Sequence, residues 1–129
     1  MKLFHYGKDG SPESKAWGFW FIEIKSLFSI VLLKFEDGSR EAYHSHAFNC
    51  FSWVLKGKLA EFLKEGSKIN IYKPSLLPFI TRKSTFHQVK STGTTWVLSF
   101  RGPWNETWEE YYPSSKVRVT LTHGRKLYE

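Results

Sequence analysis

The feature that most limits what this chain can fold into is a succession of short apolar or alternating runs, each followed by a turn signal. The runs cover residues 20–25, 28–35, 40–47, 51–56, 58–63, 68–72, 76–82, 86–90, 95–101 and 116–122. Alternation with a period of two is typical of β-strands, and spacings near ten residues are typical of sandwiches, jelly rolls and small barrels. In this interpretation residues 7–15 form an early loop. Only residues 56–64 and 106–112 can also be read as short helices, and neither has a convincing cap.

Length and composition fit one β domain. The chain has 129 residues, of which 41% are hydrophobic and 18% aromatic, and this is enough apolar surface for one core. Aromatic residues also favour pleated, half-buried surfaces. Because no internal repeat or linker divides the chain, we predict a single all-β domain over residues 1–129. Its core covers about residues 20–112, and residues 113–129 form a C-terminal extension.

The charge balance and the lone cysteine restrict the partners and the compartment. The net charge is +7, but the basic residues are scattered and no nucleic-acid motif occurs, so a small anionic molecule is favoured over nucleic acid as the partner. Cys50 is the only cysteine, which excludes an intramolecular disulfide. No apolar run is long enough to cross a bilayer, and no signal-peptide pattern is present. We therefore expect a cytoplasmic protein with no membrane partner.

Three of the five histidines form a candidate metal site. His44 and His46 lie two apart in a predicted strand, so period-two geometry places both on one face. His87 opens a later short strand, which in a jelly roll can lie beside the first. Three imidazoles suit Fe, Zn, Ni or Cu, and less exclusively Mn, and they leave the open positions typical of a catalytic metal. A His-x-His pattern alone carries no such meaning, and His5 and His123 lack this context.

Cys50 has two interpretations. It shares the parity of His44 and His46 if the strand is unbroken, which makes it a candidate fourth, soft ligand of the metal. The favoured alternative is a small buried hydrophobic residue, which is the usual state of a free cysteine.

The same region resembles the first motif of the cupin superfamily. That motif reads Gly, five residues, His-x-His, three or four residues, Glu, six residues, Gly. The spacing is kept here by Gly38, His44, His46, Cys50 and Gly57. Cysteine replaces the glutamate of the motif. The second cupin motif, Pro-x-Gly-x-x-His, is reduced to its histidine at residues 82–87.

The similarity is greatest to small stand-alone cupin-like proteins of tailed bacteriophages. It lies in the stretches 44–57, 82–87 and 96–103, with Trp108 shortly after, and covers about residues 25–112. The resemblance implies a double-stranded β-helix, the cupin or jelly-roll barrel, with a metal-binding pocket. For a phage protein the compartment would be the host cytoplasm. Cupins also often form homodimers, through sheet edges that an open sandwich exposes.

The resemblance says less about the reaction, because one cupin scaffold hosts many chemistries. Loss of the glutamate leaves three histidines, which resembles the ferrous site of cupin thiol dioxygenases. This favours a metalloenzyme, an Fe(II)-dependent oxygenase of a small anionic substrate, with the three histidines as catalytic residues and Zn, Ni or Mn as alternative metals. Tyr43, Arg82 and Arg101 are candidates for substrate binding, because a guanidinium grips carboxylate or phosphate in a bidentate manner.

Two other functions stay open. The first is an isomerase or epimerase of sugars or nucleotide sugars, metal-free or with the metal as Lewis acid, in which His46 or His87 is the general base. The second is a non-enzymatic phage accessory protein that binds a small anionic ligand or a host protein, with the aromatic-rich segment 104–112 as its surface. A chain that folds without metal would favour the isomerase.

Overall fold

The computed structural model describes residues 1–9, 16–38, 43–64, 68–105, 107–112, 115–122 and 126–127, and the regular secondary structure in them is entirely β. The strands are β1 (Lys2–Lys8), β2 (Ala16–Ile24), β3 (Phe28–Phe35), β4 (Tyr43–His44), β5 (Cys50–Lys56), β6 (Leu59–Leu63), β7 (Ile69–Tyr72), β8 (Phe79–Thr81), β9 (His87–Ser91), β10 (Thr95–Arg101), β11 (Thr107–Tyr112), β12 (Val117–Thr122) and β13 (Lys126–Leu127). No helix in these ranges could span a membrane.

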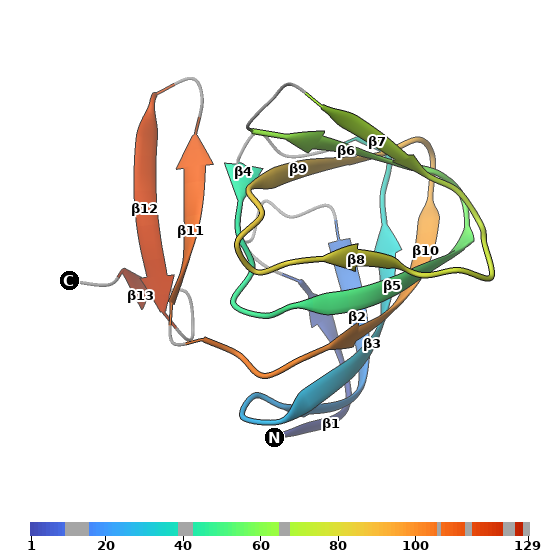
Figure 1. The fold of residues 1–129 in the computed structure, drawn as a ribbon. Helices are drawn as coiled ribbons and strands as arrows, with labels where there is room; N and C mark the ends of the chain where they lie inside the picture. The colour runs from blue at the N-terminus through green and yellow to red at the C-terminus, as the bar shows by residue number, and fades with distance from the viewer. Residues whose placement is uncertain are drawn as a thin grey trace.

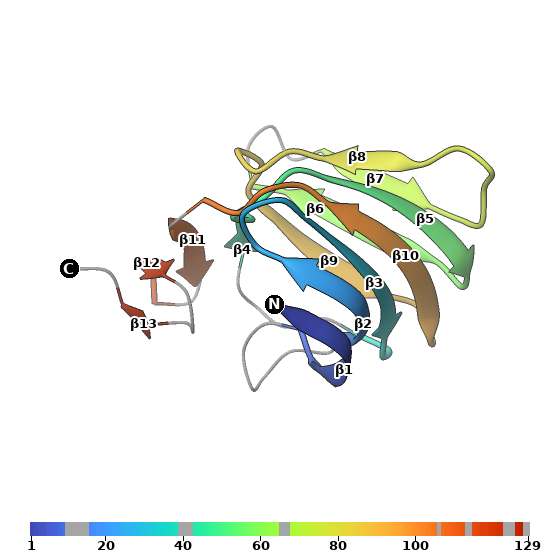
Figure 2. The ribbon, with the colours of Figure 1, turned by 90° about the horizontal axis from the view of Figure 1, so that it is seen from below.

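The strands form two antiparallel sheets that face each other (Figures 1 and 2). The six-stranded sheet has the order β1-β2-β3-β10-β5-β8, and the seven-stranded sheet has the order β13-β12-β11-β4-β9-β6-β7. Strands far apart in the sequence are neighbours, as in the pairing of β3 with β10, where Phe35 lies opposite Thr95 and Ser29 opposite Arg101. This arrangement confirms the predicted all-β jelly roll.

Alternation along the strands separates the core from the outer surface. In β10, Val97 and Ser99 are buried, whereas the neighbouring Phe100 is exposed. The core cluster takes apolar side chains from both sheets and consists of Trp20, Val31, Leu33, Val54, Leu59 and Val97. Burial of each such side chain stabilises the fold by about 1.5–3 kcal/mol. A second, smaller cluster of Ala47, Phe48 and Cys50 packs against Trp104 and Trp108.

The structure corrects several boundaries. Both helical alternatives are wrong, because residues 59–63 form β6 and residues 107–112 form β11. Part of the predicted early loop is also strand, since β1 extends to Lys8 and pairs with β2. The predicted strand at 40–47 is described only from residue 43, and its regular part ends at His44.

The last strands continue the seven-stranded sheet beyond the barrel. β11 pairs with β4 on one side and with β12 on the other, and both figures show β11 and β12 standing to one side of the barrel. β12 and β13 belong to the segment 113–129 that the sequence analysis separated as an extension. Because β11 lies between β12 and β4, this extension is one strand away from the predicted metal-binding segment.

Candidate functional site

A cavity of about 350 Å³ lies between the two sheets. Its walls are mostly apolar and aromatic, with contributions from the core and from Phe48, Trp104 and Trp108. Of the residues that the structure describes, four basic and four acidic side chains also line it: Lys2, Lys8, Lys25, Arg101, Asp9, Glu23, Glu61 and Glu110. A volume of this size fits a small molecule, and mixed apolar walls with few polar groups are typical of ligand sites.

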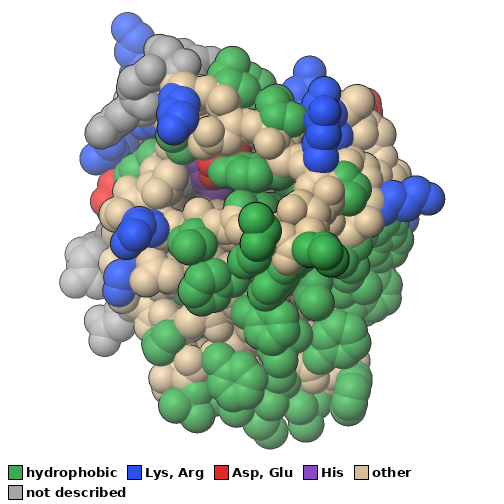
Figure 3. Space-filling model, turned by 45° about the vertical axis from the view of Figure 1, so that its right-hand side comes forward, with side chains coloured by type: hydrophobic (Ala, Val, Ile, Leu, Met, Phe, Trp, Pro, Cys, Tyr) green, Lys and Arg blue, Asp and Glu red, His purple; other side chains and the backbone are tan. Residues whose placement is uncertain are grey.

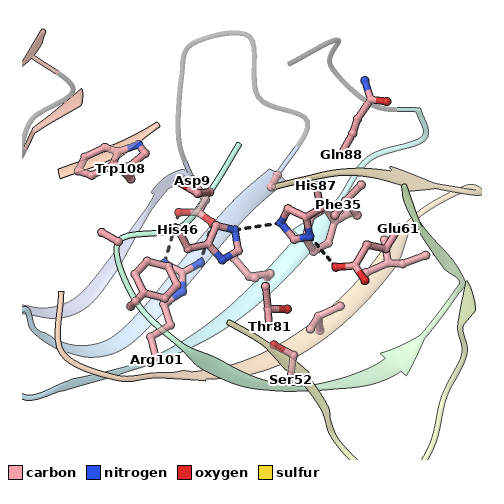
Figure 4. Close-up of a pocket in the computed structure, with 18 of the residues that line it drawn as sticks. Asp9, Phe35, His46, Ser52, Glu61, Thr81, His87, Gln88, Arg101 and Trp108 are labelled. Atoms are coloured by element: carbon pink, nitrogen blue, oxygen red, sulfur yellow. Dashed lines mark hydrogen bonds and ion pairs between the residues drawn. The ribbon is translucent and has the colours of Figure 1, made fainter. Parts of the chain in front are cut away.

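Two of the predicted histidines meet in this cavity (Figure 4). His87 begins β9 and is buried, with 3% of its surface exposed. His46 lies two residues after the end of β4, is half-buried and stacks on Phe48. The Nε2 atoms of the two imidazoles lie 3.2 Å apart. They meet because β4 and β9 are paired, with His44 directly opposite His87.

A buried carboxylate orients His87. Glu61 on β6 lies in the cavity wall, and its Oε2 is 2.6 Å from Nδ1 of His87. Its other oxygen accepts hydrogen bonds from the Tyr72 hydroxyl at 2.8 Å and the Asn70 amide at 3.0 Å. The carboxylate fixes the proton of neutral His87 on Nδ1, so the Nε2 lone pair points toward His46.

The pKa values in this network follow from the same contacts. Burial alone would raise the pKa of Glu61, but hydrogen bonds from His87, Asn70 and Tyr72 and the attraction of His87 lower it to about 2. Burial and the Glu61 carboxylate both raise the pKa of Tyr72. Glu61 is therefore an anion and Tyr72 a neutral donor throughout the physiological range.

His44 enters the site through its backbone. In the ladder it pairs with His87 on one side and with Glu110 on the other, and directly opposed residues of an antiparallel pair share one face of the sheet. Its side chain and that of Tyr43 lie outside the described part of the structure. Among the described side chains, no group of three His, Cys, Asp or Glu residues is arranged to hold a metal ion.

His46 and His87 nevertheless fit two ligand positions of a metal site. Imidazole nitrogens bind transition metals at about 2.0–2.1 Å, so two nitrogens on one ion lie about 3.0–3.4 Å apart. The separation of 3.2 Å between His46 and His87 falls in this range. A carboxylate that accepts a hydrogen bond from the outer nitrogen of a ligating histidine is also the usual support of such sites, and Glu61 occupies that position.

Arg101 lies on the same cavity but is engaged by a carboxylate. It is buried, its Nη2 is 2.7 Å from Oδ2 of Asp9, and its guanidinium stacks on Phe48. Burial alone would lower the pKa of Arg101, but Asp9 raises it. Its Nε is buried and has no hydrogen-bond partner among the described residues.

The other predicted site residues lie elsewhere. Arg82 is exposed in the turn after β8 and, of the described residues, is not one that lines the cavity. Cys50 is buried beside Ala47 and Phe48 as a free thiol. It too is absent from the described lining of the cavity, and its sulfur accepts a long hydrogen bond from the Ser52 hydroxyl at 3.9 Å.

Sequence reasoning missed Glu61 and Asp9. A signal for Glu61 was present, because it shares its strand face with Leu59, which is apolar and buried. A carboxylate at a core position is costly without partners and so indicates a buried network. Asp9 had no such signal, since it follows β1 next to a glycine-rich and polar stretch.

No protein-family model matches this chain, and no curated protein matches it. Solved structures do resemble it. A sugar phosphate isomerase of the cupin superfamily from Silicibacter pomeroyi has a TM-score of 0.65 at 12% identity, over 100% of this chain and 92% of that one.

Two further structures are similar over about three quarters of this chain. The putative ethanolamine utilization protein EutQ of Salmonella typhimurium gives a TM-score of 0.63 at 13% identity, over 78% of this chain and 80% of that chain. The Fe(II) form of HppE has a TM-score of 0.60 at 14% identity, over 75% of this chain and 55% of that chain. At such low identities the likeness concerns the fold alone. The chain therefore has the cupin fold, the double-stranded β-helix expected from the sequence.

Proposed function

We propose that this protein is a small metal-dependent enzyme that holds a divalent transition-metal ion with His44, His46 and His87 and acts on a small anionic substrate in the cavity. The observation that carries the proposal is the 3.2 Å separation of the His46 and His87 Nε2 atoms, with Glu61 holding the outer nitrogen of His87. Register supports His44 as the third ligand, because its position is opposed to His87 in the ladder.

Iron is the metal that we favour, with zinc, nickel or manganese as alternatives. Three neutral imidazoles leave the ion its full positive charge and open positions, and a bound Fe(II) would supply the activation of dioxygen. One of the structures with the same fold is described as an Fe(II) protein, HppE. The proposed reaction class is therefore oxygenation of the bound substrate.

The chain's own residues would bind and orient that substrate. Arg101 lines the cavity and would supply a positive charge to the anionic group of the substrate. Phe48, Trp104 and Trp108 form an aromatic wall of the same cavity. Such a wall excludes water and packs against an apolar or ring-shaped body. Among the described residues that line the cavity, acidic and basic groups are equal in number, so we propose a substrate with one anionic group rather than a polyanion.

One observation favours a second candidate, a sugar isomerase or epimerase. A histidine whose Nδ1 is held by a buried carboxylate, as Glu61 holds His87 at 2.6 Å, is also how enzymes arrange a general base. Nε2 of His87 would then remove the proton from substrate carbon. The similar sugar phosphate isomerase structure has the same fold. A phage accessory protein that only binds a ligand would use the same cavity without either reaction.

The test is elemental analysis after anaerobic reconstitution with Fe(II), and separately with Zn²⁺. We expect one metal ion per wild-type chain, and loss of that ion in His46→Ala and in His87→Ala. The matched control is His5→Ala, because His5 is an exposed histidine on β1 outside the cavity. A folded wild type that binds no metal would overturn the metalloenzyme and favour the isomerase. Metal content unchanged in both cavity variants would overturn the site.

A further inference from the structure

The outer face of the six-stranded sheet carries a row in which lysine and tryptophan alternate from strand to strand. Five residues on the neighbouring strands β1, β2, β3, β10 and β5 are paired in register, each with the next: Lys8, Trp17, Lys34, Trp96 and Lys56. Directly opposed residues of an antiparallel pair lie side by side on one face of the sheet. We call these five residues the Lys-Trp row.

Two further aromatic side chains join the indoles of the row into a continuous run of rings. The centroid of the Tyr6 ring lies 5.4 Å from that of Trp17 and 4.4 Å from that of Phe19, with interplanar angles of 17° and 31°. Phe19 in turn lies 6.5 Å from Trp96 at 25°. Because the ring planes are close to parallel, a flat group that stacks on one ring has the orientation to stack on the next. Tyr6 is 51% and Phe19 39% exposed, so the run is open to solvent.

Positive charge lies on the same rings. The Lys34 ammonium is 5.8 Å from the centroid of Trp96, and that of Lys8, which also borders the cavity, is 5.4 Å from the centroid of Trp17. Lys56 is exposed at the other end of the row. The Glu36 carboxylate lies outside the row and accepts a hydrogen bond from the Trp17 indole at 2.8 Å, which fixes the plane of that ring. The row itself combines three cations with two indoles.

We propose that this face binds single-stranded nucleic acid, with its bases stacked on the run of rings and its phosphates beside the lysines. Proteins that bind single strands combine these two features, an aromatic platform for the bases and a line of positive charge for the backbone. A duplex keeps its bases stacked inside and offers them no such contact. Five neighbouring strands span about 19 Å, and sites of this kind bind on the order of four or more nucleotides.

Charge favours this partner over an uncharged one. The chain has a net charge of +7, which attracts a polyanion from a distance. The sequence analysis favoured a small anionic molecule because the basic residues are scattered along the chain, but strand register gathers three of them in one row. Figure 3 shows hydrophobic side chains in a broad band over the side turned forward, with Lys and Arg side chains at the borders of that band.

The proposed nucleic-acid site is distinct from the cavity. Trp96 and Val97 are neighbours on β10, and Val97 is buried and lines the cavity, whereas the Trp96 ring packs against Phe19. Successive side chains of a strand point to opposite faces of the sheet. A single strand on the Lys-Trp row would therefore leave His46 and His87 accessible. Nucleic-acid binding should persist in the His87→Ala variant, so the two proposals can fail independently.

The test is a fluorescence-anisotropy titration of the full chain with labelled single strands of RNA and of DNA, about twelve nucleotides long, and with a duplex of equal length. We expect single strands to bind at least about 10-fold more tightly than the duplex. Lys34→Gln and Lys56→Gln should each weaken binding and reduce the slope of log K against log salt by about 0.7. Trp17→Ala should weaken binding about 10-fold and leave that slope unchanged.

The matched control is Lys90→Gln, because Lys90 is exposed on β9 of the other sheet. It should bind like wild type, and circular dichroism and the thermal midpoint check that every variant is folded. A wild type that binds no single strand at about 50 mM salt would overturn the proposal and assign the face to a different partner, such as a second copy of the chain. So would a duplex bound as tightly as single strands, wild-type affinity in all three folded variants of the row, or an equal loss in Lys90→Gln.

Discussion

His46 and His87 are 41 residues apart in the chain, and their Nε2 atoms lie 3.2 Å apart in the cavity. The contact depends on one short pairing, in which β4 meets β9 at the single register position of His44 and His87. Two imidazole nitrogens so close either share a proton or bind one cation, because their lone pairs otherwise repel. Glu61 holds the only proton of neutral His87 on the far side of its ring, which leaves an N–H of His46 or a metal ion as the partner of the His87 Nε2 lone pair.

Glu61→Gln should weaken metal binding about 10–100-fold without removing a ligand, because it takes away the carboxylate that orients His87. Competition with a chelating indicator dye measures the affinity. Glu109→Gln is the matched control, since Glu109 forms an ion pair with Arg118 at the surface and is 37% exposed. Equal affinity in Glu61→Gln and wild type would show that this carboxylate does not support a ligand.

Stability should depend on the ionisation of Glu61. Its pKa is about 2 in the folded protein, against 4.5 for an ordinary carboxyl, so its contribution is complete above about pH 4.5 and is lost as the pH falls through about 2. The loss is on the order of 3 kcal/mol. Urea unfolding at about pH 5 and about pH 2.5 should therefore show a smaller fall for Glu61→Gln than for wild type. An equal fall in the free energy of unfolding of the two proteins would contradict the assignment of this pH dependence to Glu61.

The sequence was most informative where β-branched, aliphatic and aromatic residues run together between turn signals. The strands 28–35 and 95–101 were predicted with the boundaries that the structure shows, because such a run is followed by Asp37-Gly38 in the first case and by Gly102-Pro103 in the second. β1 was missed since its residues are mostly exposed, with Phe4 at 85%, and only pairing with β2 makes them a strand. The local sequence of β11 is also compatible with a short helix. Its pairing with β4 and β12 shows that the segment is a strand.

The site residues also divide into those that the sequence could predict and those that only the fold reveals. The histidines could be predicted because motif spacing and strand parity both concern nearby residues. The contact of Glu61 with His87 could not, since it depends on the pairing of β6 with β9, which places Leu63 opposite His87. Arg82 and Arg101 are the same residue type in similar surroundings of the sequence. Only the fold shows that the first is exposed and the second is buried against Asp9.

Arg101 and Asp9 should be energetically coupled. Their bond of 2.7 Å is mostly removed from water, with exposed fractions of 5% and 28% for the two side chains. A double-mutant cycle with Arg101→Met and Asp9→Asn, followed by urea unfolding, should give a coupling energy of at least about 1 kcal/mol. The exposed pair Arg118 and Glu109 should give less than about 0.5 kcal/mol. Equal couplings would contradict the burial of the Arg101 pair.

Gly57→Ala should destabilise the fold far more than Gly93→Ala. Both glycines have positive φ, +97° and +67°, which costs any other residue about 1–2 kcal/mol. A Cβ at Gly57 would in addition come within 2.6 Å of the Thr94 carbonyl oxygen, whereas one at Gly93 meets nothing within 4 Å. Thermal unfolding compares the two variants. Similar midpoints would show that the turn at Gly57 can move away from β10.

The most direct test of the site is an anomalous-difference map from crystals of the protein loaded anaerobically with Fe(II) or with Co²⁺ as its stable substitute. The structure leads us to expect one peak between His46 and His87, within about 2.0–2.3 Å of both Nε2 atoms, with His44 as the third protein ligand. A loaded crystal whose peak lies elsewhere, or whose two imidazoles keep their direct contact with no peak between them, would contradict the metal site.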